Sequence, residues 1–272
     1  MRVLFGLCLL AWGLNLAAAP QRVVSMNLCT DQLLMLLADR DEIVSVSYLA
    51  ARPDLSVMTE QTQGLYLNHG QAEEIMRLKP DLILAGVFSA RSTVFMLKKL
   101  GYRVELLPVA SHFSTIRDNI RRVAALLGHK PRGEQLIAQF DRRLQALKNK
   151  RPSKPVMAVF YQENGYTTGK NTLADAILKQ AGFNNLAAQL GISGSGYLSL
   201  EALLMHPVDV LINGQRHSPD GSVAAAALLH PAYQHYAAQR KRLFIDDALW
   251  ICGTPFVLEA IDNLLAVHEQ KK

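Results

Sequence analysis

Short apolar runs alternate along the chain with segments whose apolar residues recur at helical spacing. Branched apolar runs predict buried strands, because parallel strands covered on both faces are apolar throughout. We expect strands at 22–26, 43–48, 81–85, 103–107, 156–161 and 242–246, and helices at 31–38, 91–100, 114–127, 172–181 and 256–267. Strands that alternate with helices predict an α/β protein with mainly parallel sheets.

The longest amphipathic segment runs from Pro131 to Lys150. Its apolar residues are Leu136, Ile137, Phe140, Leu144 and Leu147, and its opposite face is charged. Proline suits a first helical turn, where its missing N–H would have no intrahelical partner. Twenty residues at about 1.5 Å each predict a helix roughly 30 Å long, about the width of a small domain.

Two segments with a similar sequence pattern flank this helix, at 73–86 and at 201–214. Each predicts a short helix that begins with Glu, a turn that contains Pro, and a buried strand that ends in Gly. The repetition predicts two similar lobes joined by the long helix. We place the N-terminal lobe at 20–113, a helical connector at 114–151 and the C-terminal lobe at 152–272.

The first nineteen residues have the pattern of a secretory signal peptide. Arg2 precedes an apolar stretch from Val3 to Leu16, and the small residues Ala17 to Ala19 follow. The apolar stretch is too short for a transmembrane helix. We therefore expect export to the periplasm.

Charge and cysteine content narrow the functional classes. The net charge is +6, but the basic residues are dispersed among acidic ones, which argues against nucleic-acid binding. Cys29 and Cys252 are the only cysteines after the signal peptide, and in an oxidising compartment two cysteines usually form a disulfide. A soft-metal site built from Cys29, His69 and Cys252 remains the alternative.

Ligands of open α/β sheets bind beyond the carboxyl ends of the strands. The loops expected there are rich in aromatic and cationic residues, which suit a large molecule that is partly apolar and partly anionic. No nucleophile–base pair and no histidine spacing typical of a metal site is present, so we expect neither catalysis nor a resident metal. The candidate ligand-binding residues are Cys29, Tyr48, Tyr66, His69, Phe88, Tyr161, Tyr166, Arg216 and Trp250.

Helix termini supply further candidates. Glu73 and Glu201 begin the two similar segments, one in each lobe, where a carboxylate is free to point outward. We expect them to be a matched pair of docking charges. Thr30 and Thr254 are expected to cap the helices that follow them.

The mature chain resembles the class III periplasmic binding proteins of ABC importers. The resemblance rests on RVVSMNLCTDQLLMLLAD, AEEIMRLKPDLILAG, LADAILKQAGFNNLA and LSLEALLMHPVDVLING. It implies a monomer without a cofactor that holds its ligand between two lobes. It also implies that Glu73 and Glu201 contact arginines of the membrane permease.

The resemblance implies a cargo that is an iron complex of the ferric siderophore type, or cobalamin. Haem-binding members tend to carry Gly-Tyr-x-Arg before the first acidic helix, whereas here Asn68 and His69 follow Tyr66. The alternatives are a binding protein for haem or for a bare transition metal, using Tyr66, His69, Cys29 and Cys252. An exported α/β enzyme is a further alternative.

Overall fold

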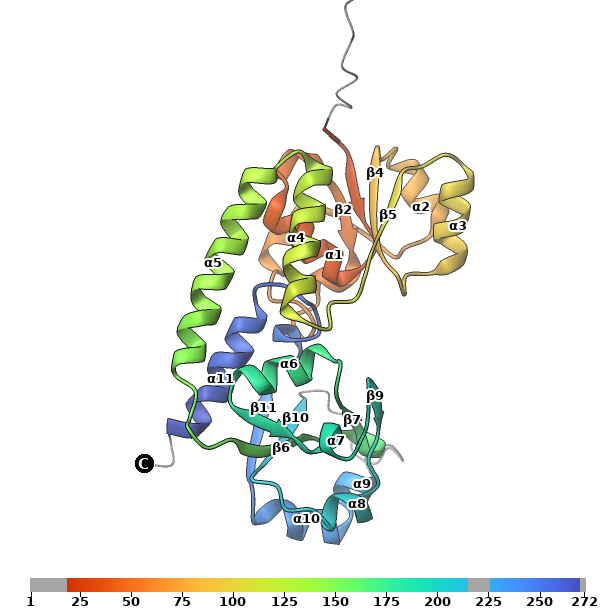
Figure 1. Ribbon diagram of the computed structural model, residues 1–272. Helices are drawn as coiled ribbons and strands as arrows, with labels where there is room; N and C mark the ends of the chain where they lie inside the picture. The colour runs from red at the N-terminus through yellow and green to blue at the C-terminus, as the bar shows by residue number, and fades with distance from the viewer. Residues whose placement is uncertain (1–18, 215–225, 270–272) are drawn as a thin grey trace, which may run out of the picture.

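The computed structural model describes residues 19–214 and 226–269, which form two α/β lobes joined by one long helix (Figure 1). Residues 1–18, which make up nearly all of the predicted signal peptide, and Arg216 lie outside the described residues. Both lobes are built on a parallel sheet, as predicted. No helix in the described ranges has the length and apolar character needed to span a bilayer.

The N-terminal lobe contains a five-stranded parallel sheet with the order β3-β2-β1-β4-β5. Its central strands are apolar because helices cover both faces, and Leu82, Ile83, Leu84 and Ala85 have no exposed surface. The strands are β1 (Val23–Ser25), β2 (Ile43–Ser47), β3 (Tyr66–Asn68), β4 (Leu82–Gly86) and β5 (Val104–Leu107). The helices are α1 (Leu28–Leu37), α2 (Ala72–Arg77) and α3 (Arg91–Lys99).

The C-terminal lobe contains a four-stranded parallel sheet with the order β11-β10-β6-β8, and a separate antiparallel pair, β7 with β9. The strands are β6 (Val156–Phe160), β7 (Tyr166–Thr168), β8 (Phe183–Asn185), β9 (Ser195–Tyr197), β10 (Val210–Gly214) and β11 (Lys241–Ile245). The helices are α6 (Leu173–Gln180), α7 (Leu186–Gln189), α8 (Leu200–Leu204), α9 (Ala226–Leu229), α10 (Pro231–Ala238) and α11 (Val257–Glu269).

The connector consists of α4 (Phe113–Leu127) and α5 (Lys130–Asn149). Gly128 ends α4 in the left-handed conformation, which glycine adopts without strain, and the chain then turns back into α5. Figure 1 shows α5 running along one side of both lobes, beside α4 above and α11 below. Ile137, Phe140 and Leu147 bury its apolar face in a core that extends through both lobes.

Two predicted helix caps are wrong. Asn27, not Thr30, caps α1, because its Oδ1 accepts the N–H of Cys29 and so starts the helix three residues earlier. Thr254 does not cap α11 with its side chain. Its hydroxyl instead donates to Oε1 of Gln32 in α1, 3.1 Å away, and so links the two lobes.

Candidate functional site

A cavity of about 800 Å³ lies between the lobes. Its upper wall comes from the loops that follow β1, β4 and β5, and its lower wall comes from the loops that follow β6 and β11 and from the start of α6. These are carboxyl ends of parallel strands, where an open sheet leaves backbone groups and loop side chains available to a ligand. The observed cavity therefore occupies the predicted place.

Four of the predicted ligand-binding residues line the cavity: Cys29, Phe88, Tyr166 and Trp250. The side chain of Phe88 is 81% exposed and so offers apolar surface to a ligand. Trp250 packs on Phe160, with 4.3 Å between ring centroids, and its Nε1 donates to Oδ1 of Asp247. These two contacts fix the indole ring in the cavity wall.

Tyr48, Tyr66 and His69 are not part of this lining. They lie beyond β2 and along β3, at the outer edge of the sheet, whereas the cavity lies over β1, β4 and β5. The rings of Tyr48 and His69 stack at 4.9 Å, and the hydroxyl of Tyr66 donates to Glu74. The structure thus gives all three side chains partners within the protein.

Tyr161 is also placed away from the cavity, and Phe160 lines it instead. Successive residues of a strand point to opposite faces, so only one of the two reaches the cavity. Tyr161 is fully buried and stacks on Tyr233 at 5.4 Å. Burial raises the pKa of the Tyr161 hydroxyl.

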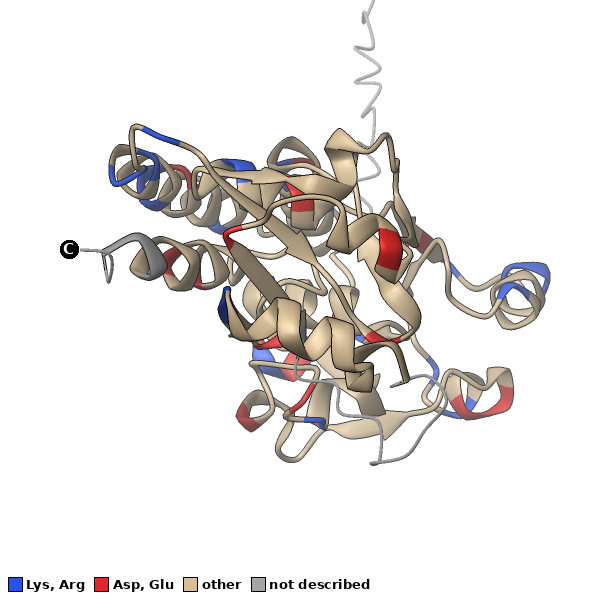
Figure 2. Cartoon of the chain, turned by 90° about the horizontal axis from the view of Figure 1, so that it is seen from below, with Lys and Arg blue, Asp and Glu red and all other residues tan. Residues whose placement is uncertain are grey.

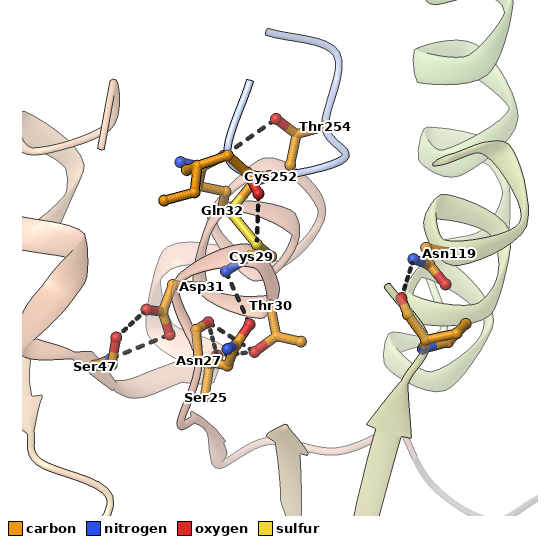
Figure 3. The surroundings of a disulfide bond; sticks show 12 residues. Ser25, Asn27, Cys29, Thr30, Asp31, Gln32, Ser47, Asn119, Cys252 and Thr254 are labelled. Atoms are coloured by element: carbon orange, nitrogen blue, oxygen red, sulfur yellow. Dashed lines mark hydrogen bonds between the residues drawn. A yellow bond between two sulfur atoms is a disulfide. The ribbon is translucent and has the colours of Figure 1, made fainter. Parts of the chain in front are cut away.

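Carboxamide side chains line the cavity and were not predicted: Asn27, Asn119, Gln162 and Asn171. Asn27 lies two residues past the end of β1, so the rule about strand ends could have found it. Asn119 lies in α4, and its Nδ2 donates to the carbonyl of Pro108 (Figure 3). Its place at the cavity depends on how α4 packs, for which the sequence holds no local signal.

The described part of the cavity lining is nearly neutral. Asp247 is the one charged side chain among the described lining residues, and no Lys, Arg or His is among them. The remaining surface is mostly apolar, with hydroxyl and carboxamide groups between the apolar patches. Such a surface holds a ligand by apolar contact and directional hydrogen bonds rather than by charge.

Cys29 and Cys252 form a disulfide, with 5.1 Å between their Cα atoms. Figure 3 shows the bond between the start of α1 and the loop before α11, so it joins one lobe to the other beside the cavity. Gly253 packs closely on Ala110, where a Cβ atom would collide with it. The disulfide occupies both sulfur atoms, so the predicted alternative of a soft-metal site loses two of its ligands.

A buried polar network lies beneath the disulfide (Figure 3). Asp31 has no exposed surface and accepts hydrogen bonds from the N–H and hydroxyl of Ser47, at 3.1 and 2.5 Å. Burial raises the pKa of Asp31 from 3.8 to about 7, and hydrogen bonds from Ser25 and Ser47 partly oppose that rise. The network fixes the first turns of α1 against β2.

The predicted docking residues Glu73 and Glu201 are both exposed, in the first turns of α2 and α8. Glu74, in contrast, is held inside its own lobe by the N–H of His69 and the hydroxyl of Tyr66. Hydrogen bonds from its own N–H and from Ser199 lower the pKa of Glu201. Each lobe therefore presents one of the two predicted docking carboxylates on its surface.

One set of potential metal ligands occurs among the described residues, namely Asp39, Glu42 and His129. His129 lies where α4 turns into α5, and none of the three residues lines the cavity. His129 already contacts Glu42 at 2.9 Å, and Arg132 contacts Asp39 at 2.6 Å. These contacts account for the cluster.

The sequence matches the family model described as periplasmic binding protein over residues 23–248. The chain belongs to this family. It is 26% identical over 205 residues to the cobalamin-binding protein of Halobacterium salinarum, an alignment that covers 74% of this chain and 56% of that protein. This periplasmic binding protein thus spans little more than half the length of that relative.

Two further matches extend the comparison. The ferric enterobactin-binding periplasmic protein FepB of Escherichia coli O6:H1 is 26% identical over 200 residues, which cover 66% of this chain and 62% of FepB. The solved structure of the periplasmic heme-binding protein RhuT from Roseiflexus sp. RS-1, in its apo form, superposes with a TM-score of 0.75 at 25% identity. That match covers 90% of this chain and 97% of RhuT.

Proposed function

We propose that this periplasmic binding protein captures a metal complex in the cavity between its lobes and delivers it to the permease of an ABC importer. The observation that carries the proposal is a cavity of about 800 Å³, lined by loops of both lobes, in a chain of this family. The relatives whose names specify cobalamin and ferric enterobactin support a cargo of this class. The protein acts by binding, without chemistry of its own.

The side chains that line the cavity restrict which kind of metal complex it can bind. A polyanionic catecholate complex of iron would need cations around it, and the described lining has none. Four carboxamides and several hydroxyl groups suit a ligand that is itself rich in amide groups and carries little net charge. We therefore favour cobalamin or a neutral siderophore complex over an anionic one.

Haem is the second candidate, supported by Tyr166. Its phenol lies at the cavity, and a tyrosine oxygen can ligate ferric haem iron. The likeness in fold to the haem-binding RhuT agrees with this candidate.

We assign the delivery of the cargo to the permease to Glu73 and Glu201. The two carboxylates are exposed, one on each lobe, and each matches the position of a docking glutamate in the family motif. We propose that permease arginines engage them, and that the protein works in the periplasm as a monomer after removal of residues 1–19.

Trp250 provides the test, because the other tryptophan, Trp12, lies in the proposed signal peptide. Purified mature protein would be titrated with cobalamin, a neutral hydroxamate siderophore, ferric enterobactin and haem while indole fluorescence is recorded. Saturable quenching by cobalamin or the hydroxamate supports the proposal. Calorimetry of Trp250→Phe with the same ligand should retain heat of binding. Correctly folded protein that binds none of the four would contradict it.

A further inference from the structure

The outer face of α3 exposes apolar side chains that nothing in the described chain covers. Phe95 is 69% exposed, Met96 42% and Leu100, just past the helix, 53%. Val94 and Leu97 on the opposite face are buried in the N-terminal lobe. The helix therefore already has its core contacts, and its second apolar surface remains open.

The same face carries cations. Arg91, Phe95 and Lys99 follow one another at spacings of four residues, and such residues are neighbours along one side of a helix. Lys98 adds a third positive charge, and α3 contains no acidic residue. Figure 2 shows this helix at the right-hand margin with blue segments and no red. In the described part of the chain no carboxylate forms an ion pair with these three cations.

The basic surface continues beyond α3. Arg77, in the last turn of α2, and Lys79 after it are exposed, and α2 packs beside α3. Lys79 stands next to Pro80 and Asp81, which border Leu100 and Arg103 in a shallow surface depression. Arg77 and Lys79 thus add two cations on the neighbouring α2 and the turn after it, where Asp81 is also exposed.

We propose that this margin, the α3 face formed by Arg91, Phe95, Met96, Lys98, Lys99 and Leu100, is a contact surface for a bilayer that carries anionic phospholipid headgroups. Lysine and arginine beside exposed phenylalanine and leucine are the composition of an interfacial helix, whose cations meet lipid phosphates while its apolar side chains enter the acyl boundary. The charge complementarity favours a lipid surface. A protein partner would instead need acidic groups arranged to match three spaced cations.

The position of α3 agrees with such a contact. It lies next to α2, whose first turn carries Glu73, and on the side of the lobe away from α5 (Figure 1). This step rests on the proposed function: when a membrane permease engages Glu73, α3 is brought to the lipid around the permease. The contact would hold the protein near the membrane while it searches for the permease.

Sedimentation with vesicles tests the proposal without any permease or cargo. Mature protein should pellet with vesicles of phosphatidylethanolamine and phosphatidylglycerol and stay in solution with phosphatidylcholine alone. Lys98→Glu combined with Lys99→Glu should weaken the binding by about tenfold or more, since each cation near an anionic surface contributes attraction. Phe95→Ser should weaken it as well, and its effect should persist at high salt, which screens charge but not apolar contact.

A matched control uses Arg142→Glu combined with Lys148→Glu, two exposed cations of α5 on the far side of the molecule. It changes the net charge equally and should leave vesicle binding intact. Equal loss in this control, binding unchanged by Phe95→Ser, or no sedimentation of the unmodified protein would each overturn the proposal. The Trp250 titration with cargo is independent of all these outcomes, so it tests the proposed function separately.

Discussion

Asp31 couples the pH of the solution to the stability of the fold. Its carboxyl is fully buried, and burial raises its pKa from 3.8 to about 7, so the native state prefers the protonated form. The native state binds this proton more tightly than the unfolded chain does. The resulting stabilisation is complete below about pH 4 and is lost as the pH rises through about 7, a change of up to about 4 kcal/mol.

Asp31→Asn should remove this pH dependence. The Oδ1 of an asparagine can still accept from the N–H of Ser47. Its Nδ2 can donate to the oxygen of the Ser47 hydroxyl, which instead donates to the carboxylate of Asp31 in the structure. Urea unfolding between pH 4 and pH 8 would be measured for both proteins, so that contributions from other groups cancel in the difference. A difference that stays constant across this range would show that Asp31 does not titrate there.

The sequence predicts cavity residues well where the strand ends determine them and poorly where packing does. Cys29, Phe88 and Trp250 follow strands, and all three line the cavity. Tyr161 was predicted to bind the ligand, but its neighbour Phe160 lines the cavity instead. Side chains alternate between the two faces of the sheet at this strand end, and the sequence does not show which face is turned toward the cavity. Asn119 could not be found at all, since it projects from a helix that belongs to the connector.

The packing of α4 against α5 depends on Gly133. A Cβ atom at this position would lie 2.5 Å from the Cβ of Ala124, so the two helices approach closely there. In a free helix Gly133→Ala would stabilise by about 1 kcal/mol. Here the overlap should outweigh that gain, because overpacking costs about 1–3 kcal/mol.

We expect Gly133→Ala to lower the free energy of unfolding by about 1 kcal/mol, as measured by thermal or urea denaturation. Ala124→Gly in the same chain removes the colliding methyl group and supplies the control. The double variant should recover stability relative to Ala124→Gly alone. A stabilised single variant would show that the helices can separate at little cost.

Long periodic elements were predictable, whereas several short strands were not, although the short β1, α2 and α8 fall in segments where a strand or helix was expected. The segments that became α4, α5, β4 and β10 carry enough turns or apolar residues for a clear pattern. In contrast, β3, β8 and the pair of β7 with β9 have three residues each, too few for any periodicity. They are strands because a neighbouring strand supplies hydrogen-bond partners, which only the folded chain shows.

At the scale of the whole molecule, Glu73 and Glu201 should act together on the permease. Glu73→Ala combined with Glu201→Ala is expected to leave cargo affinity unchanged and to abolish stimulation of the permease ATPase, because both carboxylates lie outside the cavity lining. Glu259→Ala with Asp262→Ala, on α11, is the matched control. Lost cargo binding in the first variant, or full ATPase stimulation by it, would contradict the docking role.

The last prediction concerns the covalent link between the lobes. Cys29 and Cys252 are 223 residues apart in the sequence, and a cross-link that closes so long a loop removes much entropy from the unfolded chain. On that model the bond stabilises the protein by about 5 kcal/mol. Both sulfur atoms also belong to segments that line the cavity, so the bond restrains the lobes where cargo is held.

Cys29→Ser combined with Cys252→Ser should therefore lower the free energy of unfolding by several kcal/mol and increase the rate of cargo release. Chemical denaturation measures the first effect, and stopped-flow fluorescence of Trp250 measures the second. Treatment of the unmodified protein with a reductant should reproduce both changes and should have no effect on the double variant. If the rate of cargo release stays unchanged while stability falls, the disulfide stabilises the fold alone. The lobes are then held together at the cavity by the hydrogen bond from Thr254 to Gln32 and by the packing of Gly253 on Ala110.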